Sequence, residues 1–340
     1  MKDERIKLVH GGGGEAMHGL LSVLLKKISK RKVAGGIGLD ELDDAATIPF
    51  GDEWIVFTTD SFVVKPVFFP GGDIGKLAMC GTINDLSAMG AKPIALSSAF
   101  IIGEGFRMSD LERIVSSMDK VLRETDTPII TGDTKVVEGE AGIIINTAGI
   151  GRAKNVVSDS GLRPGDKIIL NGSVGDHGIA VMAHRGGIGF QTALKSDCAP
   201  LWPLVGKVLR YDISAMKDPT RGGLAGALNE MARKAGVEIL VDEEKIPLRK
   251  EVLAASEMLG IDPLTVANEG KIVVGVSAGD AGKVLAAMKK SRYGRGACVV
   301  GEVSKTLRGG RVVLNTAVGG FRLLEAPVGD PVPRVCWAAI

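Results

Sequence analysis

The chain has 340 residues, 45% of them hydrophobic, and its 42 basic and 40 acidic residues leave a formal net charge of +2. A chain of this length usually divides into two domains, because one hydrophobic core seldom grows so large. The balanced charge argues against nucleic acid as a partner, and the lack of a membrane-length apolar run or a signal peptide favours a cytoplasmic protein with no membrane partner.

A glycine-rich segment and a helix are predicted over residues 1–40. His10 precedes four glycines, and a helix is expected from about Glu15. Consecutive glycines expose backbone N–H groups that can wrap phosphates at a helix N-terminus, although a glycine run can equally be a plain linker. Because the chain lacks a P-loop pattern, a nucleotide would bind by another scheme. The run consists of Gly11, Gly12, Gly13 and Gly14.

Residues 41–155 alternate between strand and helix patterns and are predicted to form the N-terminal domain. Apolar runs on either side of Gly51-Asp52 indicate a strand pair, and Ser109 is the expected cap of a later helix. The predicted elements are strands at 45–50 and 54–59, a helix at 73–89, a strand at 93–102, a helix at 108–124, and strands at 128–132 and 142–150.

The apolar periodicity lapses over residues 152–166, where glycine and proline cluster, and we place the domain boundary there. The C-terminal domain, residues 156–325, alternates again, so both domains are α/β or α+β in character. Its predicted elements are strands at 167–170, 237–241, 272–276 and 297–303, and helices from 178, around 204–210 and at 224–234, with further helices between the later strands.

Four cysteines are spread along the chain without the close spacing of a zinc or iron–sulfur site. Cys80, Cys198 and Cys298 have apolar neighbours and are predicted to be small core residues. Cys336 lies near the end of residues 326–340, which contain three prolines and are predicted to form a mobile tail. With Arg322 as the last anchored residue, the tail could carry Cys336 roughly 45 Å. A loose terminus with an incidental cysteine is the alternative.

Several aspartates of the first domain lie where strands are predicted to end or turns to begin. Ligands gather at strand ends in α/β sheets, and carboxylates suit Mg²⁺, which keeps substrate phosphates in its coordination shell. For any one aspartate, a simple turn cap is an equal explanation. The residues are Asp43-Asp44, Asp60, Asp85 beside Asn84, and Asp133.

Two segments of the second half are unusual, GDHGIA over residues 175–180 and DPTRGGL over residues 218–224. In the second, two glycines allow close backbone approach, and Arg221 places a rigid cationic fork at the start of a predicted helix. A structural turn explains the glycines but leaves Arg221 unexplained.

Together these motifs resemble the aminoimidazole ribonucleotide synthetase superfamily of ATP-dependent enzymes, over His10 to Gly270. DPTRGGL, Asn84-Asp85 and Gly132-Asp133 are shared by several of its members. GDHGIA and the terminal Pro-Arg-Val-Cys resemble the HypE family of hydrogenase maturation factors, which are carbamoyl dehydratases. The resemblance implies a two-domain fold with a flexible C-terminal tail, a homodimer built through the N-terminal domains, and ATP with Mg²⁺ near the dimer interface.

The resemblance also implies a reaction. In that family the carbamoyltransferase HypF carbamoylates the C-terminal cysteine, ATP activates the carbamoyl oxygen, and loss of phosphate leaves a thiocyanate. The cyanide then passes to a HypC–HypD complex for [NiFe]-hydrogenase assembly.

Carried onto this sequence, the family assigns Cys336 as the reacting thiol, Glu269 as the base, and Lys135 beside it. A turn carboxylate paired with Lys271 is the alternative for Glu269. The implied ATP-binding residues are His10, Gly11, Gly12, Gly13, Gly14, Asp60, Asn84, Asp85, Asp133 and Arg221, and the implied Mg²⁺ ligands are Asp44, Asp60, Asp85 and Asp133.

One feature departs from the family pattern, because Trp337-Ala338-Ala339-Ile340 continue past the cysteine. In the family, the active-site tunnel accepts a cysteine at the very end of the chain. Three alternatives stay open: the four residues are trimmed, the tunnel is wider in this protein, or the four residues dock outside the tunnel.

Competing functions come from the same superfamily and from one different class. Selenophosphate synthetase would need a cysteine or selenocysteine in the glycine-rich loop, and residues 10–20 contain none. A small-molecule kinase or synthetase, such as thiamine monophosphate kinase, would leave Cys336 without a purpose. A non-catalytic thiol carrier that binds ATP only as a structural ligand is the alternative from a different class.

Overall fold

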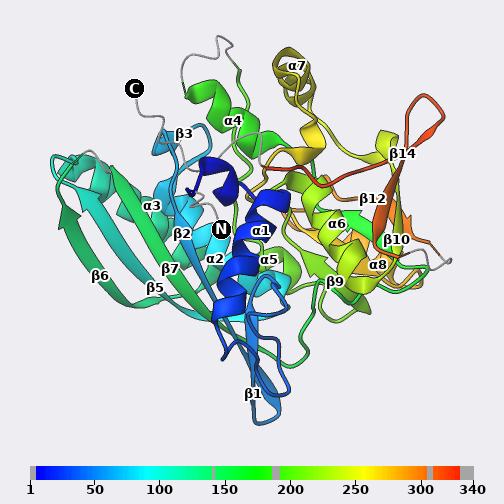
Figure 1. Cartoon of the computed structure of the whole chain (residues 1–340), viewed down its shortest axis with the longest axis horizontal. Coiled ribbons are helices and arrows are strands. Elements are labelled where there is room, and N and C mark those ends of the chain that lie inside the picture. Colours follow the sequence, from blue (N-terminus) through cyan, green and yellow to red (C-terminus); the bar gives the residue numbers. More distant parts are fainter. Residues whose placement is uncertain (1–4, 140–141, 186–191, 305–308, 330–340) are drawn as a thin grey trace.

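The structure, a computed structural model, describes residues 5–139, 142–185, 192–304 and 309–329. These residues form two large sheets with helices packed on them, and helix α1 (Gly14–Lys27) lies near the junction of the sheets (Figure 1). Cys336 and Trp337–Ile340, for which the sequence predicts a mobile arm, lie outside the described residues.

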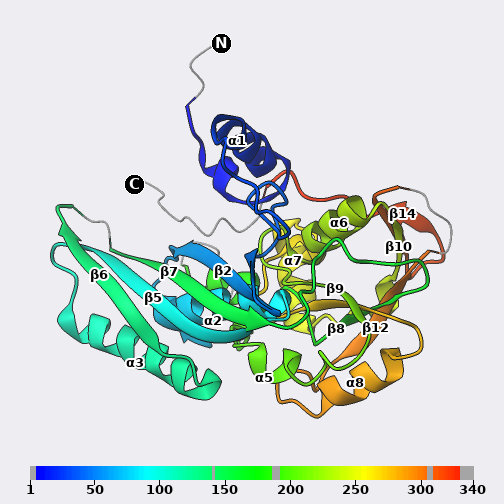
Figure 2. The ribbon, with the colours of Figure 1, turned by 90° about the horizontal axis from the view of Figure 1, so that it is seen from below.

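The N-terminal half is built on a five-stranded sheet in the order β1-β2-β7-β5-β6. β5 and β6 are parallel, and the other neighbours are antiparallel. Helices α2 (Ile74–Ala88) and α3 (Met108–Thr125) cover one face of this sheet (Figure 2). The strands are β1 (Ala46–Phe50), β2 (Glu53–Phe62), β5 (Lys92–Gly103), β6 (Ile129–Val137) and β7 (Ile143–Ala153).

The two helices differ in burial because their sequences differ in pattern. α2 is apolar or small on almost every side and is buried nearly throughout, whereas α3 buries only a stripe that includes Ile114, Met118 and Val121. The predicted order of elements in this half is confirmed. The short hairpin of β3 (Phe68–Phe69) and β4 (Gly72–Asp73) was not predicted, because two-residue strands have no periodicity.

The C-terminal half is built on a seven-stranded sheet in the order β14-β13-β10-β12-β8-β11-β9. Successive side chains of a strand point to opposite faces, so this sheet has a hydrophobic core on each face. Ile168 and Leu170 pack with α6 on one face, while Ile169 packs with α5 and α8 on the other. The strands are β8 (Lys167–Leu170), β9 (Ile213–Lys217), β10 (Glu238–Asp242), β11 (Val273–Val276), β12 (Cys298–Val303), β13 (Arg311–Asn315) and β14 (Phe321–Leu323). The helices are α4 (Asp176–His184), α5 (Trp202–Val205), α6 (Gly223–Ala235), α7 (Lys250–Leu259) and α8 (Ala281–Lys289).

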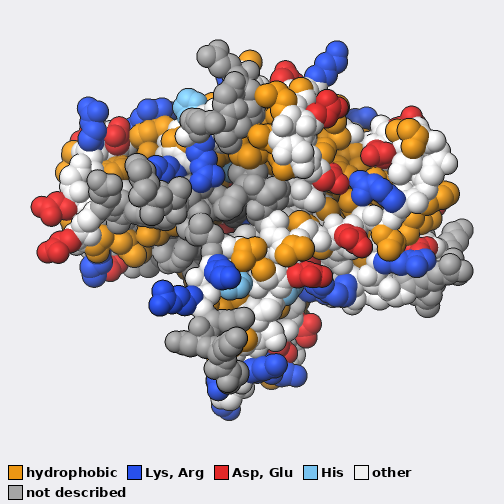
Figure 3. Space-filling model, turned by 45° about the horizontal axis from the view of Figure 1, so that its top comes forward, with side chains coloured by type: hydrophobic (Ala, Val, Ile, Leu, Met, Phe, Trp, Pro, Cys, Tyr) orange, Lys and Arg blue, Asp and Glu red, His pale blue; other side chains and the backbone are white. Residues whose placement is uncertain are grey.

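Several predictions for this half need correction. Strands β9, β13 and β14 were missed, and the helix predicted around 204–210 is only the four-residue α5 followed by turns. Cys80 and Cys198 are buried as predicted, whereas Cys298 is only half-buried at the start of β12. On the face shown in Figure 3, acidic and basic side chains are interspersed, as the balanced composition leads one to expect.

The chain remains anchored past Arg322, so the assumption that Arg322 is the last anchored residue is wrong. Buried Leu324 donates its N–H to Val312 (3.0 Å), and the carbonyl of Val328 accepts the N–H of Ala16 in α1 (3.3 Å). Pro327 packs where Gly14 and Gly222 have no side chain, since a Cβ on either glycine would crowd it. From Gly329, Cys336 is seven residues further along the chain and can reach roughly 23 Å, about half the predicted distance.

Replacing Asp73 with alanine is expected to lower the free energy of unfolding by about 1–2 kcal/mol. Asp73 is the N-cap of α2, and its Oδ1 accepts the N–H groups of Gly75 (2.9 Å) and Lys76 (3.0 Å). Ser109→Ala is the control, because α3 begins after Arg107 without a side-chain cap and the prediction of Ser109 as its cap is wrong. Denaturant titration of both variants checks the difference, and equal losses would contradict the capping role of Asp73.

Candidate active site

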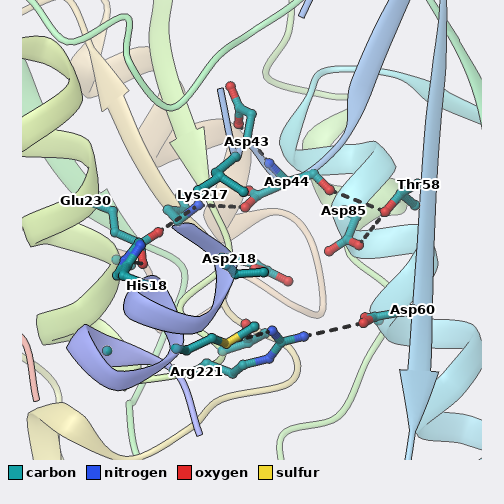
Figure 4. A pocket seen from close by; sticks show the side chains of 18 of the residues that line it. His18, Asp43, Asp44, Thr58, Asp60, Asp85, Lys217, Asp218, Arg221 and Glu230 are labelled. Atoms are coloured by element: carbon teal, nitrogen blue, oxygen red, sulfur yellow. Dashed lines mark hydrogen bonds and ion pairs between the residues drawn. The ribbon is translucent and has the colours of Figure 1, made fainter. Parts of the chain in front are cut away.

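A cavity of about 250 Å³ lies where α1, the first sheet and the start of α6 meet. Figure 4 shows its acidic and basic side chains facing one another across the space. Its polar lining comprises His18 of α1, Asp43 and Asp44 before β1, Thr58 and Asp60 of β2, Asp85 of α2, Lys217, Asp218 and Arg221 around the start of α6, Glu230 of α6, and Glu269.

Asp60 and Asp85 face the cavity, but they do not lie at strand ends or turns as the sequence predicts. Asp60 lies inside β2, and Asp85 lies inside α2. Thr58 and Asp60 are two residues apart and so share the helix-covered face of β2, where Thr58 Oγ donates to Asp85 Oδ2 (2.8 Å). The predicted pair therefore meets through strand register and helix packing.

Burial is the main reason that the pKa of Asp85 is raised well above its usual value, and the nearby carboxylates of Asp60, Asp218 and Asp44 raise it further. Burial likewise raises the pKa of Asp44 to about 6, although Lys217 opposes the shift. Carboxylates crowded in this way favour a bound cation, which would lower the cost of ionising them.

The fit of Mg²⁺ to these residues depends on Asp44. Its Oδ2 is buried and has no hydrogen-bond partner among the described residues. In the described part of the chain, no three His, Cys, Asp or Glu side chains are grouped closely enough to hold a metal ion unaided. A magnesium ion here would therefore complete its shell with water and nucleotide oxygens, as Mg²⁺ commonly does.

Lys217, at the end of β9, is the buried cation of the cavity, and the sequence analysis missed it. Its Nζ contacts Asp44 (2.7 Å), Asp159 (3.0 Å) and Glu230 (3.3 Å). Burial alone would lower the pKa of Lys217, but these three carboxylates outweigh it and raise the pKa well above its usual value. The position of Lys217 next to the DPTRGGL segment could have indicated its role, but an isolated lysine in a sequence usually lies on the protein surface.

Arg221 faces the cavity from the start of α6, as expected. Its Nη2 lies 3.5 Å from Asp60 Oδ1, and a Cβ on Gly13 would lie 2.8 Å from Arg221 Cβ. Gly13 and Gly14 line the cavity, whereas Gly11 and Gly12 do not. His10 is also outside the lining, and its Nδ1 accepts the N–H of Lys7 (2.9 Å).

Glu269 lines the cavity and is only 2% exposed. Its N–H donates to Asp197 Oδ1 (3.1 Å), and its carbonyl accepts Asn84 Nδ2 (3.2 Å). Lys271, the alternative partner suggested by the sequence, pairs with Asp197 (2.7 Å). The backbone of Glu269 is therefore fixed from both sides.

Asn84 lies outside the lining of the cavity. Its side chain is buried, its oxygen accepts the N–H of Leu201 (2.8 Å), and its nitrogen donates to the carbonyls of Ala199 (3.1 Å) and Glu269 (3.2 Å). Because backbone groups engage both ends of the amide, the predicted contact with ATP finds no support here.

Asp133 and Lys135 lie on β6 and pair with each other (2.8 Å) outside the cavity lining. The hydrogen bond from Lys135 lowers the pKa of Asp133. The sheet register aligns Lys135 with Ile101, on the face opposite the one that carries Asp60. Within one chain, Lys135 is therefore not beside Glu269 as the sequence analysis expected.

The comparisons with known proteins identify the class to which this fold and site belong. Residues 42–153 match the N-terminal domain of the AIR synthase related proteins, and residues 163–313 match their C-terminal domain. The predicted two-domain α/β fold of this superfamily is confirmed.

Closer relatives are similar over almost the whole chain. A protein of Methanocaldococcus jannaschii named for hydrogenase expression and formation is 50% identical over 338 residues, 98% of this chain and 100% of its own. The carbamoyl dehydratase HypE of Rhodobacter capsulatus is 43% identical over 345 residues, covering 99% of both chains. The chain belongs to the HypE family of hydrogenase maturation proteins within the AIR synthase related proteins.

Two solved structures are similar in fold and sequence. A chain in the crystal structure of a HypE-HypF complex has a TM-score of 0.84 at 44% identity, covering 91% of this chain and 99% of that one. A HypE crystal structure in complex with ATP has a TM-score of 0.80 at 40% identity, covering 98% and 100%. In the described part of the present chain, no helix has the length and apolarity needed to cross a membrane.

Glu230→Gln is expected to lower the free energy of unfolding by roughly 2–3 kcal/mol at pH 7. Burial alone would raise the pKa of Glu230, but the hydrogen bond with His18 and the charge of Lys217 lower it from 4.5 to about 2. This contribution is complete above pH 4.5 and is lost as pH falls toward about 2, so the difference between variant and wild type should shrink over that window.

Denaturant unfolding measured at several pH values checks this expectation, with Glu257→Gln, an exposed glutamate of α7, as the control. A difference that stays constant from neutral to strongly acidic pH would contradict the ionic role of Glu230.

Proposed function

We propose that this chain is a cytoplasmic, ATP-dependent carbamoyl dehydratase, a lyase that converts an S-carbamoyl group on its own Cys336 into a thiocyanate for [NiFe]-hydrogenase assembly. The main observation behind the proposal is the position of Pro327, which holds the C-terminal segment next to the cavity. Pro327 packs on Gly14 at the lining of the cavity, and Glu269 lies within that lining. The remaining chain is long enough to bring Cys336 into the same space.

The residues of this chain suit the chemistry. The carbamoyl oxygen attacks the γ-phosphorus of ATP, the bond to ADP breaks, and the carbamoyl nitrogen loses a proton to give a phosphorylated imidate. Loss of the second N–H proton then expels phosphate and leaves the C≡N group on sulfur. Glu269, buried and held at both backbone groups, is proposed to accept the proton from nitrogen.

ATP and Mg²⁺ are proposed to bind across the same cavity. Arg221 and the N–H groups at Gly13 and Gly14 would face the phosphates, and Asp44, Asp60 and Asp85 would face the magnesium ion. Bound Mg²⁺ supplies positive charge that offsets the charge of the transferred phosphoryl group. The similar HypE structure in complex with ATP supports nucleotide binding.

A homodimer is proposed to complete the site. The face of the first sheet opposite α2 and α3 exposes apolar side chains, and Asp133 and Lys135 share that face. A second copy packed there would bring its own Lys135 toward the cavity that one chain leaves without it. The exposed apolar residues are Ile48, Phe50, Phe57, Ile101 and Ile150.

HypF is the proposed donor of the carbamoyl group, because a HypE-HypF complex contains a chain of the same fold at 44% identity. A HypC–HypD complex is the proposed acceptor of the cyanide. The alternative of a thiol carrier predicts no phosphate release that depends on carbamoylated Cys336, and a small-molecule kinase predicts phosphate transfer without any role for the tail.

Incubation with HypF, carbamoyl phosphate and MgATP is expected to leave a cyano group on Cys336, detected by tandem mass spectrometry of the C-terminal peptide. Glu269→Gln should retain the carbamoyl group and form thiocyanate about 10²–10⁴-fold more slowly, because the base is lost. Cys336→Ala removes the acceptor, and Glu257→Gln is the matched control for the lost carboxylate. Intact ATP turnover with an unmodified tail would overturn the proposed function, and the same peptide reports whether Trp337–Ile340 remain.

Mixing Lys135→Ala with Glu269→Gln is expected to restore up to about a quarter of wild-type activity if a second copy supplies Lys135, since half of randomly mixed dimers contain one intact site of two. Each variant alone should be nearly inactive. Phe57→Asp should yield a monomer by light scattering, whereas Met258→Asp, an equally simple change at an exposed methionine of α7, should not. No gain of activity on mixing would assign Lys135 to its own chain or to no catalytic role.

A further inference from the structure

The segment that carries Glu269 separates two cavities. Glu269 lines the first, while the next two residues, Gly270 and Lys271, line a second cavity of about 380 Å³. The second cavity is also lined by the loop after β8, by Asp176 of the GDHGIA segment, by Arg249, and by residues 195–197, 292–293 and 295–296. The proposed dehydration uses none of these groups directly.

Five basic side chains from four segments line this second cavity. Arg249 pairs with Asp176 (3.0 Å), Lys271 with Asp197 (2.7 Å), and Arg292 with Glu124. The other two, Lys195 and Arg295, form no ion pair with any residue that the structure describes. The lining therefore has a surplus of positive charge, which favours an anion.

Asp176 adds an acceptor to this basic lining. Its side chain is only 3% exposed, and its Oδ2 accepts Ser173 Oγ (2.6 Å) and Arg249 Nε (3.0 Å). Its Oδ1 is buried and has no hydrogen-bond partner among the described residues. A buried carboxylate oxygen of this kind is stabilised by a ligand that donates a hydrogen bond.

We propose that this cavity binds a phosphate-class oxyanion that retains a hydrogen. Lys195 and Arg295 meet its negative charge, and Asp176 Oδ1 accepts its O–H. Sulfate has similar size and charge but carries no hydrogen at neutral pH, so it leaves that oxygen without a donor. Free phosphate keeps such a hydrogen at neutral pH, whereas a phosphate monoester keeps one only as its monoanion, because its second pKa is about 6.

Binding at this cavity would also be connected to the first one. Asp197 accepts the N–H groups of Glu269 (3.1 Å) and Gly270 (3.2 Å) while it pairs with Lys271. An oxyanion near Lys271 competes with Asp197 for the same ammonium group. Two residues, Lys271 and Asp197, thus connect the proposed ligand to the backbone of Glu269.

Isothermal titration of the full chain with inorganic phosphate tests the site, with Mg²⁺ and a non-hydrolysable ATP analogue present to fill the first cavity. Because the readout is binding without turnover, it stands whether or not the proposed dehydration is correct. Phosphate should bind at millimolar concentration or below. Lys195→Ala and Arg295→Ala should each weaken it by roughly tenfold or more, through loss of a charge-assisted hydrogen bond.

Lys154→Ala, which removes an exposed lysine outside the segments that line this cavity, is the matched control and should leave binding unchanged. Sulfate should bind at least about tenfold more weakly than phosphate, and Asp176→Asn should narrow that difference, because an amide can donate to sulfate. Glycerol phosphate distinguishes the two kinds of ligand. Binding as tight as that of inorganic phosphate indicates a phosphate ester, and weaker binding indicates the free ion. Undetectable phosphate binding, equal binding of sulfate, or an equal effect of Lys154→Ala would overturn the proposal.

Discussion

The arrangement of the first cavity depends on one buried cation. Lys217 contacts a carboxylate that precedes the first strand, one from the segment between the two sheets, and one from α6. A lysine buried among carboxylates is costly to remove, because it would leave several charges unpaired away from water. The contact therefore fixes the first domain, the connecting segment and the second domain around the same space. It also leaves one oxygen of Asp44 available to that space.

A second set of contacts fixes the proposed base. Asn84 reaches from the first domain to the carbonyl of Glu269, and Asp197 accepts its N–H from the second domain. A general base contributes most when its position is set before the substrate arrives, since little ordering then remains for the reaction step. The junction of the two domains is thus the place where such a carboxylate is best oriented. The need to hold this carboxylate in place explains why polar side chains such as Asn84 are buried at the domain junction although they do not line the cavity.

The sequence predicts the elements of the first domain well, because their apolar residues repeat with the period of a helix or a strand. It also identifies Asp44, Asp60, Asp85, Arg221 and Glu269 as members of one site. It places Asp60 and Asp85 at strand ends or turns, whereas they lie inside β2 and α2. The two residues meet through strand register and helix packing, which a sequence pattern does not specify. Lys217 escaped notice because burial of a lysine is decided by partners distant in sequence. The contact of Pro327 with Gly14 and Gly222 was missed for the same reason, because three distant segments create it.

That contact bears on the proposed reaction of Cys336, because Pro327 is much nearer to Cys336 along the chain than Arg322 is. Cys336 follows Gly329 by seven residues, half its separation of fourteen residues from Arg322. For a flexible tether the effective concentration of its end near its origin varies with about the −3/2 power of length, so halving the tether raises it roughly threefold. The same shortening limits the volume that the thiol can search. For a tether of this kind, packing between a proline and two glycines would favour encounters with the chain's own cavity over encounters with distant surfaces of other proteins.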